Sequence, residues 1–187
     1  MANSQIRLAY TLKAGIASGD NPAVFIGIGS NKLVLTPNTA VDNSYWWFFL
    51  DNSSLKEVYS VVVPGANNTT VPPNITTYIT NPNILFGVAT QYLGSNHLPQ
   101  GALYDFFANY DSGDALKELE QANASMGCGY LGQISYALLG QGGPGGPTQP
   151  PSYEAGSFNS PSFVEITLGS QLSGQPPYYL IDEYTFQ

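Results

Sequence analysis

Charged side chains are scarce in this sequence. They make up 10% of its 187 residues, against roughly 25% in ordinary soluble domains. All five cations lie at or before Lys117, and the formal net charge is −8. A chain of this charge repels phosphate groups and has no basic stripe to neutralise them, so we expect neither nucleic acid nor an anionic membrane surface as a partner.

Residues able to carry out chemistry are equally few. Cys128 is the only cysteine, which excludes an intrachain disulfide, and His97 is the only histidine. One thiol and one imidazole cannot supply a zinc site, and the segment 111–114 does not match a calcium-binding loop. The segment 27–32 lacks the third glycine of a nucleotide-binding fingerprint, and no Gly-x-Ser-x-Gly elbow is present. We therefore predict no metal, no cofactor and no catalytic centre.

Long apolar runs are also missing. No window approaches 18 apolar residues, and the N-terminus lacks the apolar run of a signal peptide. The sequence predicts no membrane span. The expected location is cytoplasmic by default, with release or export without a signal peptide left open.

What the chain does have is a strand-rich hydrophobic pattern. Hydrophobic residues make up 43% of the sequence, enough to close a core, and we expect residues 1–187 to form one domain. The segment 45–50 is apolar at every position, which indicates a central strand covered on both faces. Further strands are predicted at 6–12, as a hairpin within 23–35, and at 58–63, 84–90, 134–139, 162–168 and 178–186.

Helical spacing is confined to the middle of the chain. A short helix is expected at 72–79, a second after Pro99, and a third that is capped by Ser112 or Asp114 and ends at Gly127. The segment 140–160 is expected to be a loop, because it is rich in Gly, Pro and Gln. The pattern predicts a β-rich α+β fold: two antiparallel sheets in a sandwich-like arrangement, with two or three short helices between residues 72 and 127.

Recognition chemistry is better represented than catalysis. The chain has 13 Tyr, 9 Phe and 2 Trp among many amides, a composition that suits sugar binding and equally suits an uncharged self-assembling surface. Trp46 and Trp47 are expected in the core. The candidate ligand-binding residues share one polar loop at a strand end, and they are Gln91, Tyr92, Asn96 and His97. For His97 three roles remain open: plain loop polarity, ligand contact or catalysis.

From about residue 45 to residue 170 the order of elements resembles the ILEI/PANDER-type domain family, the interleukin-like EMT inducers with their lectin-like stem relative. The segments that carry the resemblance are 46–51 with 58–63, 84–90 with 94–98, 116–127, 134–142 and 161–166. The resemblance implies two antiparallel sheets with flanking helices and a non-catalytic, carbohydrate-binding role. The chain departs from the family where 91–93 replaces an acidic pair and where an arginine near Gln133 is missing, so no binding residue is carried over.

Two classes of function follow from these observations. The leading hypothesis is a non-catalytic, lectin-like module that binds a glycan or another protein surface. The alternative is a self-assembling structural or inclusion-forming protein, or a secreted effector or toxin component. The low charge and the open edge strands motivate this alternative, and a homo-oligomer is expected with it. An enzyme with an unfamiliar site is the third and least favoured hypothesis.

Overall fold

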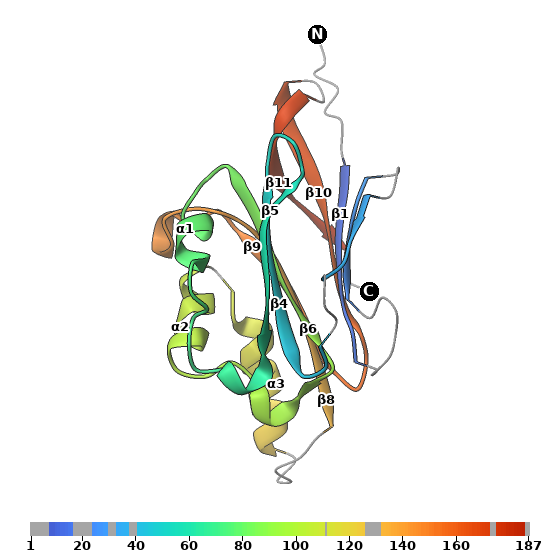
Figure 1. The fold of residues 1–187 in the computed structure, drawn as a ribbon, viewed down its shortest axis with the longest axis vertical. Coiled ribbons are helices and arrows are strands. Elements are labelled where there is room, and N and C mark those ends of the chain that lie inside the picture. Colours follow the sequence, from blue (N-terminus) through green and yellow to red (C-terminus); the bar gives the residue numbers. More distant parts are fainter. Residues whose placement is uncertain are drawn as a thin grey trace.

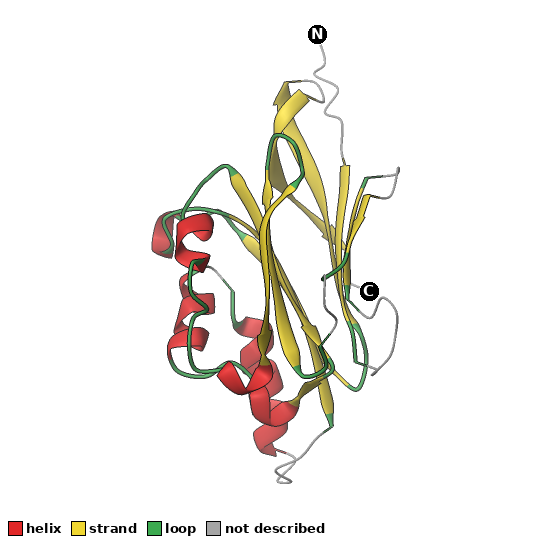
Figure 2. Ribbon diagram, viewed as in Figure 1, coloured by secondary structure: helices red, strands yellow, loops and turns green. Residues whose placement is uncertain are grey.

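The computed structural model describes residues 8–16, 24–29, 33–37, 41–110, 112–125, 132–172 and 175–185. These segments form two antiparallel β-sheets that face one another, with helices on the outer side of one of them (Figures 1 and 2). The prediction of a β-rich α+β fold with two antiparallel sheets is confirmed.

The first sheet, sheet A, brings together strands from the two ends of the chain. Its order is β11-β10-β1-β2-β3. The strands are β1 (Leu8–Ala14), β2 (Phe25–Ile28), β3 (Leu33–Leu35), β10 (Ser162–Leu172) and β11 (Gln175–Thr185). β1 lies between β2 and β10 and pairs antiparallel with both. The predicted hairpin within 23–35 is confirmed as β2 and β3.

The second sheet, sheet B, is built from the middle of the chain. Its order is β5-β4-β6-β8-β7, and β9 also pairs with β8. The strands are β4 (Ser44–Asp51), β5 (Glu57–Pro64), β6 (Ile84–Gln91), β7 (Leu93–Gly94), β8 (Gln133–Gln141) and β9 (Ser152–Phe158). The central strands β4, β6 and β8 are buried along almost their whole length.

Sheet B is covered on both faces, and this explains its apolar strands. Sheet A covers one face, and the helices α1 (Ile75–Ile79), α2 (Ala102–Asn109) and α3 (Asp114–Ser125) lie beyond the other (Figure 2). Three short 3-10 turns, η1 (Gly65–Asn67), η2 (Ser95–His97) and η3 (Gly146–Thr148), lie between the strands and helices. Along β4 the side chains alternate between the two cores: Trp46 faces sheet A and Trp47 faces the helices. Both are 1% exposed, so their predicted place in the core is confirmed.

Two large rings in sheet B lie over glycines on the neighbouring strand. Phe48 on β4 is opposite Gly87 on β6, and Phe86 on β6 is opposite Gly140 on β8. A Cβ atom on Gly87 would lie 2.1 Å from Phe48 Cζ, and one on Gly140 would lie 2.4 Å from Phe86 Cζ. The glycines therefore provide the room that the rings need, one pair on each face of the sheet.

The sheets are joined to each other at both ends of the sandwich. At one end Gly15, which follows β1, donates its N–H to the Thr90 carbonyl and accepts from the Tyr92 N–H. At the other end the Tyr178 N–H donates to the Asn52 carbonyl at 2.8 Å. Ser135 on β8 and Ser162 on β10 add a third connection, with their buried hydroxyl oxygens 2.7 Å apart.

The predicted loop at 140–160 is wrong over much of its length. β8 continues to Gln141, and β9 occupies residues 152–158. β9 pairs with β8 from Ser152 to Phe158, and this pairing holds in extended form a segment whose own composition favours turns. The predicted helix at 72–79 begins only at Ile75, and the expected cap of the third helix at Gly127 lies outside the described residues.

Candidate functional site

The loop predicted to bind a ligand, which contains Tyr92, Asn96 and His97, is held by a polar cluster around Asn43. The Asn43 side-chain oxygen accepts the Gly94 N–H at 3.2 Å and lies 2.8 Å from His97 Nδ1. Its backbone carbonyl accepts the Gly65 N–H. Asn43 therefore ties the start of β4 to η1, β7 and η2, and it does so with a φ of 56°.

The ring of His97 is engaged on both nitrogens. Besides the contact with Asn43, Nε2 lies 3.4 Å from the Asn96 side-chain nitrogen. The Asn43 oxygen can only accept, so His97 Nδ1 donates to it, and the Asn96 amide nitrogen faces Nε2 on the other side of the ring. The Tyr45 hydroxyl donates to the His97 backbone carbonyl, and burial raises the pKa of Tyr45 well above its ordinary value. This arrangement fixes the position of His97.

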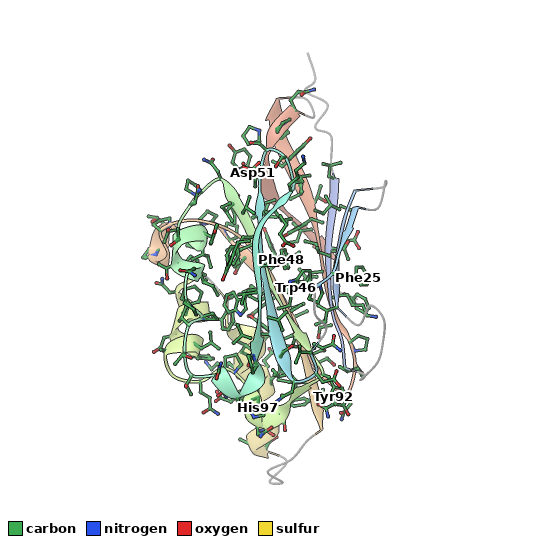
Figure 3. All side chains as sticks on the ribbon, viewed as in Figure 1. Phe25, Trp46, Phe48, Asp51, Tyr92 and His97 are labelled. Carbon is green, nitrogen blue, oxygen red and sulfur yellow. The ribbon has the colours of Figure 1, made fainter. Side chains whose placement is uncertain are left out.

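The four predicted site residues are only partly brought together. Asn96 and His97 contact each other. Figure 3 shows Tyr92 at the same end of the molecule as His97, far from Asp51 at the end of β4. Asn96 is exposed, whereas Tyr92 is half-buried with a φ of 46°. The placement of Gln91 in a polar loop is wrong. It is the last residue of β6, opposite Ser44, and it is 4% exposed.

A second candidate site lies between α3, β9 and the start of β10. It is an open groove of about 810 Å³. Its lining is mainly polar: two exposed carboxylates come from α3, a third comes from β9, and serines come from both strands and the turn between them. Its lining includes Asp114, Glu118, Glu154, Ser157, Ser160 and Phe163. No lysine or arginine is among the described residues that line the groove.

Glu154 fixes the helical wall of this groove. One carboxylate oxygen accepts the N–H groups of Gly113 and Ala115 at 2.9 and 2.8 Å, at the start of α3. The other accepts the Tyr136 hydroxyl at 2.6 Å. A carboxylate at a helix N-terminus satisfies donors that have no partner within the helix. Burial, followed by the Glu154 charge, raises the pKa of Tyr136 well above its ordinary value.

The strand wall approaches α3 closely at Gly156. A Cβ atom there would lie 2.7 Å from Leu119 Cδ1. The glycine therefore lets the helix rest directly on β9, and the groove opens beside this contact.

Sequence reasoning missed the groove because it treated its strand wall as a loop. One signal was present: Glu154 is the only acidic residue between Glu120 and Glu165. A lone carboxylate in a long uncharged segment is a candidate for a specific partner, and here the partners are the start of α3 and Tyr136.

Two further findings concern the described residues alone. They contain no group of three or more His, Cys, Asp or Glu side chains placed to hold a metal ion. Within the same residues, no helix has the length and apolarity needed to cross a membrane. Cys128 and Asp111 lie outside them.

No known protein family model matches the chain, and no curated protein matches it either. The resemblance to the ILEI/PANDER-type family therefore stays a prediction.

Proposed function

We propose that this chain is a non-catalytic binding module and that the groove between α3, β9 and β10 takes a carbohydrate. The observation that carries the proposal is the groove itself, which combines a volume of about 810 Å³ with a lining of carboxylates, hydroxyls and aromatic rings. A volume of this size lies within the range of small-molecule sites.

The lining suits a polyhydroxylated ligand. The exposed carboxylates of Asp114 and Glu118 can accept hydrogen bonds from sugar hydroxyls, and Ser157 and Ser160 can donate or accept them. The half-buried ring of Phe163 adds apolar surface for the C–H face of a sugar.

The charge of the groove narrows the class of ligand. Its charged lining residues are all acidic, and the chain as a whole carries a net charge of −8. Sulfated, phosphorylated or uronic-acid glycans would be repelled. The proposed ligand is therefore a neutral sugar or an amino sugar.

Two observations favour binding over catalysis. The ring nitrogens of His97 are both engaged within the cluster around Asn43. The carboxylate oxygens of Glu154 hold α3 and Tyr136. Each of these groups has a structural task that a catalytic proton transfer would interrupt.

The proposal is tested by screening the labelled protein on a glycan array and titrating the best ligand by calorimetry. We expect selective binding to neutral or amino glycans, and Glu118→Ala should weaken it at least tenfold. Glu120→Ala is the matched control. It removes the same charge from another exposed position on the same helix, but Glu120 does not line the groove.

The variant Asn96→Ala tests whether the ligand binds in the groove or in the loop that contains Asn96 and His97. Asn96 is exposed and lies beside His97 rather than in the groove, so the variant should bind as the wild type does. Loss of binding in Asn96→Ala with full binding in Glu118→Ala would move the site to the loop. A blank array for the folded wild type would overturn the proposed function.

A further inference from the structure

β5 leaves one backbone edge unpaired. It is the terminal strand of sheet B, and within the described residues its only strand neighbour is β4. It also carries Val58, which is 46% exposed and is one of two exposed large hydrophobic residues in the described part of the chain. An unpaired edge with apolar side chains is a template for another strand.

The direction of the free backbone groups follows from the register with β4. Gly65 donates to the Asn43 carbonyl, and this bond continues the ladder in which Tyr45 is opposite Val63. Hydrogen-bonded positions alternate along an antiparallel pair. Val63 and Val61 therefore direct their backbone groups toward β4, whereas Val62 and Ser60 direct theirs outward. Pro64, which has no N–H to donate, falls at an outward position.

The two faces of β5 differ in what covers them. On the helix side, Tyr59 stacks on Tyr78 of α1 with ring centroids 4.8 Å apart, so α1 shields this face. Val62 on the opposite face packs against the core between the sheets. Val58 and Pro64, near the two ends of the strand, remain exposed.

We propose that β5 pairs with β5 of a second copy of this chain, antiparallel and about a two-fold axis at Val61. In this register Ser60 is opposite Val62 of the other copy, and four hydrogen bonds use the outward N–H and carbonyl groups of both residues in each copy. The two sheets B then join into one continuous sheet across the axis.

The register is self-complementary in its side chains as well. Val58 lies at a register shift of β5, between Tyr59, which is opposite Phe49, and Glu57, which is opposite Leu50. In the proposed pair this bulged Val58 of each copy comes close to Pro64 of the other, so the exposed apolar residues at the two ends of the strand cover each other. The charged residues Lys56 and Glu57 fall outside the overlap of residues 58–64, and no like charges are placed opposite one another.

The other described edge of sheet B is less suitable for a second copy. β9 packs against α3 through the close contact between Gly156 and Leu119, and its outer side opens on the groove. A strand added there would compete with the helix and with the proposed ligand.

Sedimentation of the full chain over a dilution series tests the contact. The wild type should reach twice the mass of one chain, and Val58→Lys should shift the dimer dissociation constant at least tenfold toward monomer. Ser60→Pro should do the same, because it removes an outward N–H and leaves the ladder to β4 intact. Val41→Lys is the matched control, since Val41 is similarly exposed, at 41%, and lies before β4 rather than on the edge.

A cysteine pair tests the register. In a Cys128→Ser background, Val61→Cys should form an intermolecular disulfide under mild oxidation, since non-hydrogen-bonded antiparallel partners have Cα atoms about 4.5 Å apart. Val63→Cys, on the same strand and equally half-buried, is the control and should stay reduced. A monomeric wild type at all concentrations, or equal cross-linking of the two variants, would overturn the proposal.

Discussion

Asn43 shows how much of the site region rests on one side chain. It holds a positive φ and supplies acceptors to Gly94, His97 and Gly65. Asparagine and aspartate tolerate this backbone region better than other residues with a side chain.

We expect Asn43→Ala to lower the free energy of unfolding by about 1–3 kcal/mol, because it leaves the partly buried Gly94 N–H and the imidazole N–H without their acceptor and adds backbone strain. Asn43→Asp keeps an acceptor and should stay near the wild type. Urea denaturation followed by circular dichroism measures both, and equal stability of the two variants would contradict the role given to the side chain.

Residue positions were predictable where hydrophobicity decides burial. Trp46 and Trp47 belong to an apolar segment, and both are buried. Gln91 is the opposite case, because a polar residue after an apolar strand looks the same in sequence whether it begins a loop or ends the strand. Its burial follows from Ser44 on β4 and from the bridge to Gly15, and neither contact leaves a local sequence signal.

At the scale of elements, the pairs of aromatic ring and glycine decide how closely the strands of sheet B pack. Phe48 is fully buried, and its ring occupies the space that a Gly87 side chain would need. The pair spans two strands that are far apart in the sequence, so the pattern of either strand alone does not reveal it.

Gly87→Ala should destabilise the protein by about 1–3 kcal/mol, since the added Cβ displaces a buried ring in a filled core. Gly27→Ala is the control: on β2 the nearest atom to its Cβ would be 4.0 Å away, so this variant should match or slightly exceed the wild type. Thermal denaturation compares them. Adding Phe48→Leu to Gly87→Ala should recover part of the loss, and strictly additive losses would refute the steric explanation.

β9 marks the limit of prediction at the element scale. The segment 152–158 contains two serines and a glycine and follows two prolines, so local preference favours a loop. Its strand conformation is imposed by β8, along which it pairs over its whole length. Because the groove lies on this strand, the error in secondary structure was also an error about the site.

At the scale of the whole molecule, buried tyrosines set the response to alkaline pH. Burial raises the pKa of Tyr10, Tyr45 and Tyr136 above the ordinary value of 10.0. These hydroxyls are therefore held neutral in the folded state. Above about pH 10 the unfolded chain releases protons that the folded chain keeps, so the free energy of unfolding must fall as pH rises.

We expect Tyr10, Tyr45 and Tyr136 to stay un-ionised while the fold persists and to ionise only when it is lost. Absorbance at the tyrosinate band, recorded with circular dichroism during an alkaline titration, distinguishes tyrosines that ionise in the folded protein from those that ionise only on unfolding. A single transition near the ordinary pKa for all tyrosines, with native circular dichroism throughout, would contradict their burial.

The overall architecture could be predicted because two patterns were clear in the sequence. Strand-like apolar segments occur near both ends and in the middle of the chain, and helical spacing of apolar residues is confined to residues 72–127. The pairing order was beyond such reasoning. Nothing in the segment 8–14 indicates that its partners are β2 on one side and β10 on the other, since the pairing is specified by the shape of the assembled core.

The pairing of β1 with β10 also determines when sheet A can be completed during synthesis of the chain on the ribosome. Leu8 is opposite Leu168 and Ala14 is opposite Ser162, so the first strand is made long before its partner exists. At about 5–20 residues per second, the wait is on the order of 10–30 s. During that time the strands of sheet B emerge in turn and can pair with one another. The nascent chain must therefore keep one edge of β1 from meeting another molecule until β10 arrives to close it.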